Sequence, residues 1–424
     1  IMMNRQSQPP KRTGSRILIY SHDTIGLGHL RRCRAIAQSL VENFSRLSVL
    51  IISGSPIIGS FNFRTRVDFI RIPGIIKLRD GEYTSLNLHL KVDETLALRQ
   101  SIIQHTADVF SPDIFIVDKE PLGLRGEVTP ALAILKDRGA RIVLGLRDVL
   151  DDPVRLAPEW QRKGAMAAIE KFYDEVWIYG LPGIHEPLQG LNPPAPVTAK
   201  LNYTGYLCSR LPHAPVAMNW PGITSGPYIL VTTGGGGDGE GLIDWVLSAY
   251  EYCAHSGAPP PMPALLVLGP FMTAEAQAGF LSRAASLPLV HAITFESNIE
   301  QLQDRAAAIV AMGGYNVFCE ILALDKPALL LPRREPRLEQ TIRAVSAEQL
   351  GLVSVLHDPI DTGAKTRDPG VMLQALHALV TRKPPSAVQV PGLRDGLANV
   401  AKLTAPWLKP ESRLGKSATI PSGT

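Results

Sequence analysis

The sequence predicts an α/β fold in which two similar domains, each built on a parallel sheet, face each other. Short apolar runs alternate with amphipathic helical segments along the chain, and this alternation is typical of parallel strands joined by crossover helices. Both halves also open alike, with a strand, a glycine-rich loop and a helix. The 424 residues exceed one domain of ~150 residues and agree with two domains plus tails.

The first half opens with an apolar run at 16–21, which predicts a strand, followed by apolar residues at helical spacing over 29–44. The same periodicities predict the remaining elements in order. The predicted strands are 48–53, 67–72, 113–117, 141–146 and 175–179, and the predicted helices lie near 92–110, 127–137 and 158–173.

The second half begins after two segments rich in Pro and Gly, at 181–196 and 212–227, which indicate a domain boundary. Its predicted strands are 228–232, 264–268, 307–311, 328–331 and 353–356, and a helix is predicted at 240–255. We expect an N-terminal domain over 14–210 and a C-terminal domain over 220–390. A helix within 391–408 is expected to pack back on the N-terminal domain, and 409–424 to be a disordered tail.

Composition excludes several classes of protein. Hydrophobic residues make up 45% and charged residues 19% of the chain, and the net charge of +4 is too small to indicate a nucleic-acid partner. The four cysteines lack zinc-ligand spacing, which predicts no metal site and a reducing, cytoplasmic compartment. No apolar run approaches the ~20 residues of a membrane-spanning helix, and the N-terminus lacks the apolar core of a secretory signal.

The first candidate site is the loop GLGH, which joins the first predicted strand and helix and ends at His29. Ligands bind at this place in open α/β sheets. Arg31 stands where the dinucleotide fingerprint needs its third glycine, so dinucleotide binding is not supported. At a helix start, where the dipole is positive, His29 is favoured in its neutral form and suits a general base. A capping or solvated histidine is the alternative interpretation.

Two glycine loops in the second half follow predicted strands. The run 232–239 (TTGGGGDG) is suited to a backbone nest for phosphate oxygens, and it lacks the Gly-Lys-Ser/Thr ending of a P-loop. Gly313 and Gly314 precede a predicted helix that carries Glu320 in its second turn, where a carboxylate could accept hydrogen bonds from a ribose diol. A flexible turn and a solvated glutamate are the alternative interpretations. In the next loop Arg333, Arg334 and Arg337 could neutralise phosphate, although surface charge clusters are commoner.

The ordered motifs GLGH, TTGGGG, MGGYNVFCEIL and KPALLLPRREPRLEQTIRA resemble those of glycosyltransferases of GT-B fold. They resemble in particular family 28, which contains the peptidoglycan-forming UDP-N-acetylglucosamine transferase. The closer resemblance is to a related bacterial group of predicted glycosyltransferases, and it is carried by VDKEPLG at 117–123 and LGLRD at 144–148. The resemblance covers about 15–381 and implies two Rossmann-like domains that face each other across a cleft.

The resemblance further implies that the C-terminal domain binds a nucleotide-sugar, with a UDP-sugar such as UDP-N-acetylglucosamine as the expected donor. Glu320 would hold the ribose, and Glu339 and Gln340 would contact the donor sugar. The residues expected at the donor site are Gly28, Gly234, Gly235, Gly236, Gly313, Gly314, Tyr315, Asn316, Glu320, Glu339 and Gln340. The family's usual GGTGGH loop is here TIGLGH, followed by Arg31 and Arg32, so the acceptor need not be the peptidoglycan lipid.

The resemblance implies an inverting transfer, in which a base deprotonates the acceptor hydroxyl. His29 is the first candidate base and Asp23 the second, with Asp118 and Asp148 at strand ends as supporting polar groups; each aspartate could equally be a cap or turn residue. Helix dipoles and loop N–H groups can stabilise the leaving nucleoside diphosphate. Since no D-x-D motif offers a metal site, we expect no metal and no cofactor beyond the nucleotide-sugar.

The segment 74–87 is predicted to be an acceptor loop or an ordinary surface excursion. For a lipid-linked acceptor, Ile75, Ile76, Lys77 and Arg79 could rest on an anionic membrane surface, giving peripheral contact with the inner face of the membrane. A glycan or small-molecule acceptor is equally compatible with the sequence. The competing functions are a nucleotide-sugar epimerase or hydrolase of the same fold, and a non-catalytic protein that binds sugar nucleotides or glycans.

Overall fold

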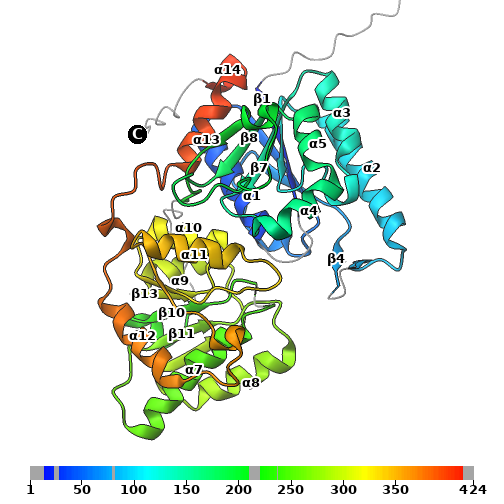
Figure 1. The fold of residues 1–424 in the computed structure, drawn as a ribbon. Helices are drawn as coiled ribbons and strands as arrows, with labels where there is room; N and C mark the ends of the chain where they lie inside the picture. Colours follow the sequence, from blue (N-terminus) through cyan, green and yellow to red (C-terminus); the bar gives the residue numbers. More distant parts are fainter. Residues whose placement is uncertain (1–13, 23–27, 79–81, 210–219, 236, 414–424) are drawn as a thin grey trace, which may run out of the picture.

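The computed structural model describes residues 14–22, 28–78, 82–209, 220–235 and 237–413. Of the residues singled out above, Asp23, Gly26, Leu27, Arg79 and Gly236 lie outside the described residues, as does most of the predicted tail. The chain forms two α/β units, one above the other in Figure 1, each with a central parallel sheet. A small antiparallel hairpin is attached to the N-terminal unit.

The N-terminal sheet has seven parallel strands in the order β3-β2-β1-β6-β7-β8-β9. Alternate residues of β1 point to opposite sides of the sheet: Ile17 and Ile19 join the core beneath α1, and Leu18 and Tyr20 join the core beneath α3 and α5. Both faces are thus buried, which explains why its strands are almost wholly apolar. The strands are β1 (Ser15–Ser21), β2 (Leu47–Ser53), β3 (Val67–Arg71), β6 (Ile114–Asp118), β7 (Arg141–Arg147), β8 (Glu175–Tyr179) and β9 (Leu201–Tyr203).

Helices cover both faces of this sheet, as Figure 1 shows. Their bounds are α1 (Gly28–Asn43), α2 (Val92–Phe110), α3 (Thr129–Asp137), α4 (Pro153–Lys163), α5 (Ala165–Phe172) and α6 (Ala195–Thr198). The hairpin comprises β4 (Ile75–Lys77) and β5 (Tyr83–Ser85) and precedes α2.

The C-terminal sheet has six parallel strands in the order β12-β11-β10-β13-β14-β15. The strands are β10 (Ile229–Thr232), β11 (Ala264–Val267), β12 (Val290–Ile293), β13 (Ala308–Ala311), β14 (Ala328–Leu330) and β15 (Ser354–Val355). The helices are α7 (Glu240–Ser256), α8 (Ala274–Ala285), α9 (Ile299–Arg305), α10 (Tyr315–Leu324), α11 (Glu339–Gln349) and α12 (Pro369–Thr381).

The two sheets share one topological feature that positions the site. The first strand of each, β1 or β10, lies between the next strand in sequence and a strand reached by a long crossover. The strand order reverses there, and ligands of open α/β sheets bind beside the carboxyl ends of the strands at such a reversal. The loops after β1 and β10 carry two of the three glycine motifs selected above, GLGH and TTGGGG.

After α12 the chain returns to the N-terminal unit through α13 (Gly396–Thr404) and α14 (Pro410–Arg413), next to α1 in Figure 1. Ser15 N donates to Ser412 Oγ at 2.8 Å, and the Trp177 and Trp407 rings stack 6.3 Å apart. Gly396 permits a close approach, because a Cβ there would lie 2.3 Å from Tyr206 O.

Several predicted elements need correction. The single helix predicted over 158–173 is two helices, α4 and α5, separated by Gly164 at φ +60°. The side chain of Asp152 caps α4 by accepting from Val154 N, so this helix begins at Pro153 and Pro158 lies inside it. β9, β12 and the hairpin were not predicted. Ile75 is 1% exposed, which contradicts its predicted place on a membrane, because β4 turns its side chain inward.

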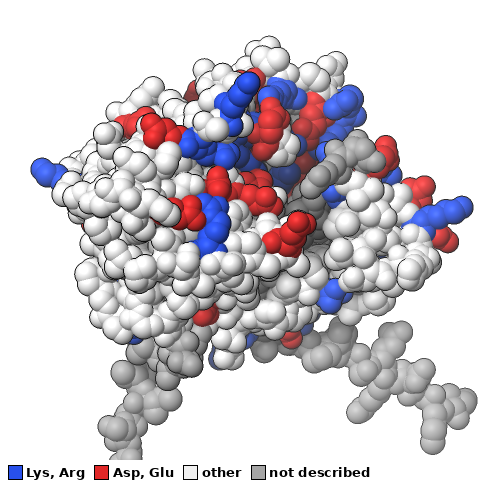
Figure 2. Space-filling model, turned by 90° about the horizontal axis from the view of Figure 1, so that it is seen from below, with Lys and Arg blue, Asp and Glu red and all other residues white. Residues whose placement is uncertain are grey.

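Two surface observations bear on partners. Within the described residues, no helix combines the length and apolarity that crossing a bilayer requires. Figure 2 shows a face on which Lys and Arg side chains lie among Asp and Glu side chains, with broad areas that carry neither charge. This mixture agrees with the near balance of 43 basic and 39 acidic residues.

Candidate functional site

The candidate site lies where the carboxyl ends of the strands of both sheets meet. Asn316, in the first turn of α10, donates from Nδ2 to Gly28 O at the start of α1, at 2.9 Å. The N-termini of the two helices therefore converge, one from each domain. Unpaired N–H groups at helix N-termini favour an anion, and here two such ends face one region.

His29 and Asp118 form a close pair on the N-terminal side of the site. His29 is the second residue of α1, and Asp118 ends β6, which pairs directly with β1. His29 Nδ1 lies 2.5 Å from Asp118 Oδ2, and Arg32 donates to the other oxygen, Oδ1, from Nε at 3.0 Å and from Nη2 at 2.6 Å. An ionised carboxylate only accepts hydrogen bonds, so Nδ1 must carry the proton to bind Asp118, and Nε2 is then left as the acceptor. Arg32 Nη2, which is also a donor, lies 2.9 Å from the same Nδ1.

The electrostatics of this pair favour a neutral imidazole beside an ionised carboxylate. Burial lowers the pKa of His29 to about 4, against the opposing charge of Asp118. Burial opposes ionisation of Asp118, but Arg32 and His29 hold its pKa below the ordinary value. The position of His29 at a helix start predicts the neutral form through the helix dipole, whereas burial is its largest cause. With 14% of its side chain exposed, His29 has the form and access of a general base.

The Gly313–Gly314 turn and the start of α11 form the C-terminal side of the site. Gly313 has φ +88°, which favours glycine. The fully buried Arg343 donates from Nη1 to Gly313 O and to Glu339 Oε2, both at 2.8 Å. Asp148, at the end of β7, binds the rest of this guanidinium from the opposite domain, at 2.9 Å to Nε and 2.7 Å to Nη2.

Asp148 therefore has a different role from the one expected. The sequence analysis grouped it with Asp118 as support for the base, but its described partners are Arg343, Tyr206 and its own neighbour Val149. Burial opposes ionisation of Glu339, while Arg147 and Arg343 lower its pKa to about 2. Glu339 is thus an ionised carboxylate, 2% exposed, in the wall of the site.

The glycine loop after β10 lies beside the start of α11. Arg333 forms an ion pair with Asp238 of this loop, and its backbone N–H donates to Gln340 Oε1 at 3.2 Å. Gly234 has φ +68°. Arg337 crosses to the N-terminal domain and pairs with Glu159 at 2.9 Å, while Arg334 is exposed. The three arginines therefore do not form the predicted cluster, because each lies in a different environment.

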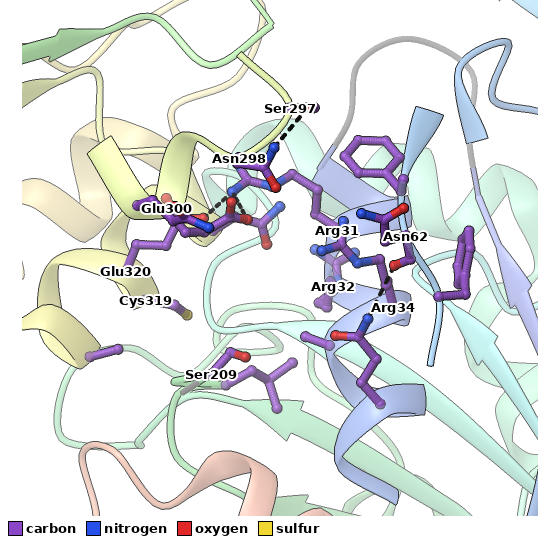
Figure 3. Close-up of a pocket in the computed structure, with 18 of the residues that line it drawn as sticks. Arg31, Arg32, Arg34, Asn62, Ser209, Ser297, Asn298, Glu300, Cys319 and Glu320 are labelled. Carbon is purple, nitrogen blue, oxygen red and sulfur yellow. Dashed lines mark hydrogen bonds and ion pairs between the residues drawn. The ribbon is translucent and has the colours of Figure 1, made fainter. Parts of the chain in front are cut away.

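Glu320 lines a cavity of about 560 Å³ between α1 and the helices α9 and α10. Figure 3 shows Arg31, Arg32 and Arg34 on one wall and Glu300 and Glu320 on the other. Arg31 pairs with Glu320 and, at 3.0 Å, with Glu300. A cavity of this size fits a nucleoside.

Glu320 also has a partner on its own side of the cavity. Gln303 Nε2 donates to Glu320 Oε2 at 2.5 Å, while the buried Oε1 of Gln303 has no partner among the described residues. Burial raises the pKa of Glu320 to about 7, against the lowering effect of Arg31. A ligand that offers hydroxyl donors here would replace Arg31 as the partner of this carboxylate.

The predicted site residues thus fall into neighbouring groups. Gly28, His29 and Asn316 lie at the two converging helix ends. The residues around Arg343 and Arg333 form a second group, made up of Gly234, Gly235, Gly313, Gly314, Glu339 and Gln340. Tyr315 is 3% exposed and its hydroxyl donates to Tyr179 O at 2.6 Å, so its side chain is engaged in the core between the domains. Among the described residues, no three His, Cys, Asp or Glu side chains come close enough together to hold a metal ion.

Sequence reasoning missed several charged and polar residues of the site, namely Lys119, Arg147, Glu300, Gln303 and Arg343. A signal existed for Arg343, which follows Glu339 by four residues and so shares its helix face. No local signal existed for Glu300 or Gln303, because α9 and α10 are brought together by the sheet.

Solved structures share the architecture across nearly the whole chain. MurG of Acinetobacter baumannii matches 92% of this chain and 98% of its own, with a TM-score of 0.54 and 12% identity. A UDP-glucosyltransferase from Polygonum tinctorium matches 94% and 99%, with a TM-score of 0.57 and 14% identity. The UDP-GlcNAc 2-epimerase of Methanocaldococcus jannaschii matches 92% and 99%, with a TM-score of 0.55 and 12% identity.

Sequence comparison adds nothing to these likenesses. No protein-family model matches the sequence, and no curated protein matches it. At 12–14% identity, the likeness to solved structures is one of fold. The chain has the GT-B fold, with two Rossmann-like domains arranged as in these glycosyltransferases and this epimerase.

Proposed function

We propose that the protein is an inverting, metal-independent glycosyltransferase that moves a sugar from a nucleotide-sugar to an acceptor hydroxyl. The observation that carries this proposal is the His29–Asp118 pair, which presents a neutral imidazole beside the converging N-termini of α1 and α10. A base and an anion-binding helix end on opposite sides of one site are what such a transfer needs.

In the proposed reaction, His29 Nε2 accepts the proton of the acceptor hydroxyl while Asp118 holds the ring through Nδ1. The hydroxyl oxygen forms a bond to the anomeric carbon from the face opposite the leaving group. The bond between that carbon and the phosphate oxygen breaks, and the nucleoside diphosphate leaves with the electron pair. The first N–H groups of α10, beyond Gly313 and Gly314, would stabilise its negative charge.

The donor is proposed to be a UDP-sugar, such as UDP-N-acetylglucosamine. Structures of the same fold, LpCGTa and TcCGT1, were solved in complex with UDP, which supports this choice. Glu320 would accept from the two ribose hydroxyls in the cavity, and Glu339 and Gln340 would contact the sugar. The acceptor is a glycan, a lipid-linked glycan or a small molecule.

The experiment is a turnover assay with UDP-, GDP-, ADP- and dTDP-sugars, with and without a panel of acceptors. We expect one donor to release its nucleoside diphosphate mainly when an acceptor is present, and His29→Asn to abolish this release while still binding the donor. His89→Asn, at an exposed position on the same domain, is the matched control. Full turnover by His29→Asn would contradict the proposed base.

A nucleotide-sugar epimerase is the second candidate function, because one structure of the same fold is a UDP-GlcNAc 2-epimerase. The same assay separates the two activities. An epimerase converts the donor sugar to its epimer when no acceptor is present, whereas a transferase leaves it unchanged. Donor binding without any turnover would instead indicate a non-catalytic binding protein.

A further inference from the structure

Two cations lie next to the His29–Asp118 pair and have no part in the proposed proton transfer. Lys119 directly follows Asp118 at the end of β6, and Arg147 ends β7, the neighbouring strand. Lys119 has φ +67° and its backbone N–H donates to Gly145 O at 2.8 Å, which holds it at this edge of the sheet. Non-glycine residues seldom adopt this conformation, and those that do often belong to functional sites.

Both side chains are largely buried, at 20% exposed for Lys119 and 14% for Arg147, yet neither head group makes a hydrogen bond to a described residue. The nearest carboxylate to Lys119 Nζ is Glu120 at 3.9 Å, and Lys163 already holds both oxygens of that carboxylate at 3.0 Å. The nearest to Arg147 is Glu339 at 3.5 Å, which Arg343 already holds at 2.8 Å.

Arg147 has a hydrogen-bond donor that no described residue accepts from. Arg147 Nε is buried and has no hydrogen-bond partner among the described residues. Leaving a buried charged donor without an acceptor is costly, and proteins accept such a cost at ligand sites more readily than elsewhere. An ammonium and a planar guanidinium together suit an oxyanion, because each can form charge-assisted hydrogen bonds to its oxygens.

We propose that Lys119 and Arg147 bind an anionic group of the acceptor, a carboxylate or a phosphate monoester, close to the hydroxyl that His29 deprotonates. This inference rests on the proposed function and narrows its acceptor to anionic molecules. Both cations belong to the N-terminal domain. Lys119 directly follows Asp118, the partner of His29, and Arg147 ends the strand that pairs with β6. The donor contacts proposed above lie mainly on the C-terminal domain.

The donor diphosphate is the competing ligand, because Arg147 also lies beside Glu339. Affinities for D-glucuronate, inorganic phosphate and D-glucose are therefore measured by calorimetry on the full chain, with and without UDP. We expect D-glucuronate or phosphate to bind and D-glucose not to bind, and the stronger anion identifies the acceptor group as a carboxylate or a phosphate. Lys119→Gln and Arg147→Gln should weaken that binding at least tenfold and change the affinity for UDP less than twofold.

The controls keep the outcomes distinct. Arg162→Gln removes an exposed arginine of the same domain and should leave anion affinity unchanged, and Arg147→Lys, which keeps the charge, should fall between wild type and Arg147→Gln. Anion binding that is equal in all variants, or absent from the wild type, overturns the proposal. The proposal is also overturned if Lys119→Gln and Arg147→Gln lose UDP affinity tenfold and if UDP competes with the anion. That result would assign both cations to the donor. Failure of the proposed function would appear separately, as no nucleoside diphosphate release from any donor.

Discussion

The imidazole of His29 is tied to Asp118 at 2.5 Å, and Arg32 binds the other oxygen of the same carboxylate. The carboxylate therefore connects a candidate base to a permanent cation. Because Arg32 and His29 hold the pKa of Asp118 below its ordinary value, the ionised carboxylate favours the tautomer of His29 that carries its proton on Nδ1. The first prediction follows from this arrangement.

The pH dependence of kcat/KM should differ from that of an enzyme whose base is a histidine with an ordinary pKa. Burial lowers the pKa of His29 to about 4, and a protonated imidazole cannot accept the hydroxyl proton. In the Glu320→Gln background, which removes the carboxyl group whose pKa burial raises to about 7, the rate should stay level as the pH falls from about 7 to about 5 and decline below that, as the base becomes protonated. Initial rates in constant-ionic-strength buffers measure this, with His89→Asn as the control. A decline centred near the ordinary histidine value would contradict the assignment.

The buried ion pair between Asp148 of the N-terminal domain and Arg343 of the C-terminal domain should stabilise the folded protein. Both side chains are completely buried, and removing one partner of a buried pair costs about 3 kcal/mol or more. We expect Asp148→Asn to lower the free energy of unfolding by about this amount in urea titrations. Glu42→Gln breaks the exposed pair with Arg64 and should cost less than about 1 kcal/mol. Equal effects would show that the buried pair contributes no more than a surface pair.

Glu320 should recognise the ribose hydroxyls of the donor. Burial raises the pKa of Glu320 to about 7, so the carboxylate is charged at pH values well above 7. There Glu320→Gln removes the charge that strengthens hydrogen bonds from the diol, and UDP should bind about tenfold more weakly. 2′,3′-Dideoxyuridine diphosphate lacks both hydroxyls and should bind the variant and the wild type equally. Calorimetry measures both affinities, with Glu275→Gln, exposed on α8, as the control. Equal losses for the two nucleotides would place Glu320 elsewhere than at the ribose.

The predicted contact with membranes can be tested with variants of the β4–β5 hairpin. Lys77 and Leu78 are exposed, and a lysine near an anionic surface contributes about 1 kcal/mol. In flotation with anionic vesicles at low salt, Lys77→Glu should reduce retention about fivefold or more, whereas Lys402→Glu, at an exposed position on α13, should not. A wild-type protein that fails to float would contradict membrane contact by this hairpin.

Local patterns in the sequence located most strands and helices, and long-range contacts determined the rest. The strand predicted at 175–179 and the helix at 92–110 have the bounds observed for β8 and α2, because burial and periodicity act within each segment. The strand β9 has three residues, too few for an alternating pattern to stand out. It forms because β8 offers a free edge to pair with.

The same distinction applies to the site. His29 and the glycine loops were recognisable because each lies directly after a strand. The partnership of His29 with Asp118, 89 residues apart, depends on β6 pairing with β1. The partnership of Arg343 with Asp148, 195 residues apart, depends on how the two domains meet. Neither the periodicity nor the spacing of residues indicates which residues far apart in the sequence become partners.

The return of α13 and α14 to the N-terminal domain has a consequence for motion. The chain passes between the domains twice, once between β9 and β10 and once between α12 and α13. A domain that is joined to its neighbour by two covalent connections can move away from it less far than a domain joined by one. The return of the chain therefore also limits how far α10 can move from α1, whose N-termini meet at the site.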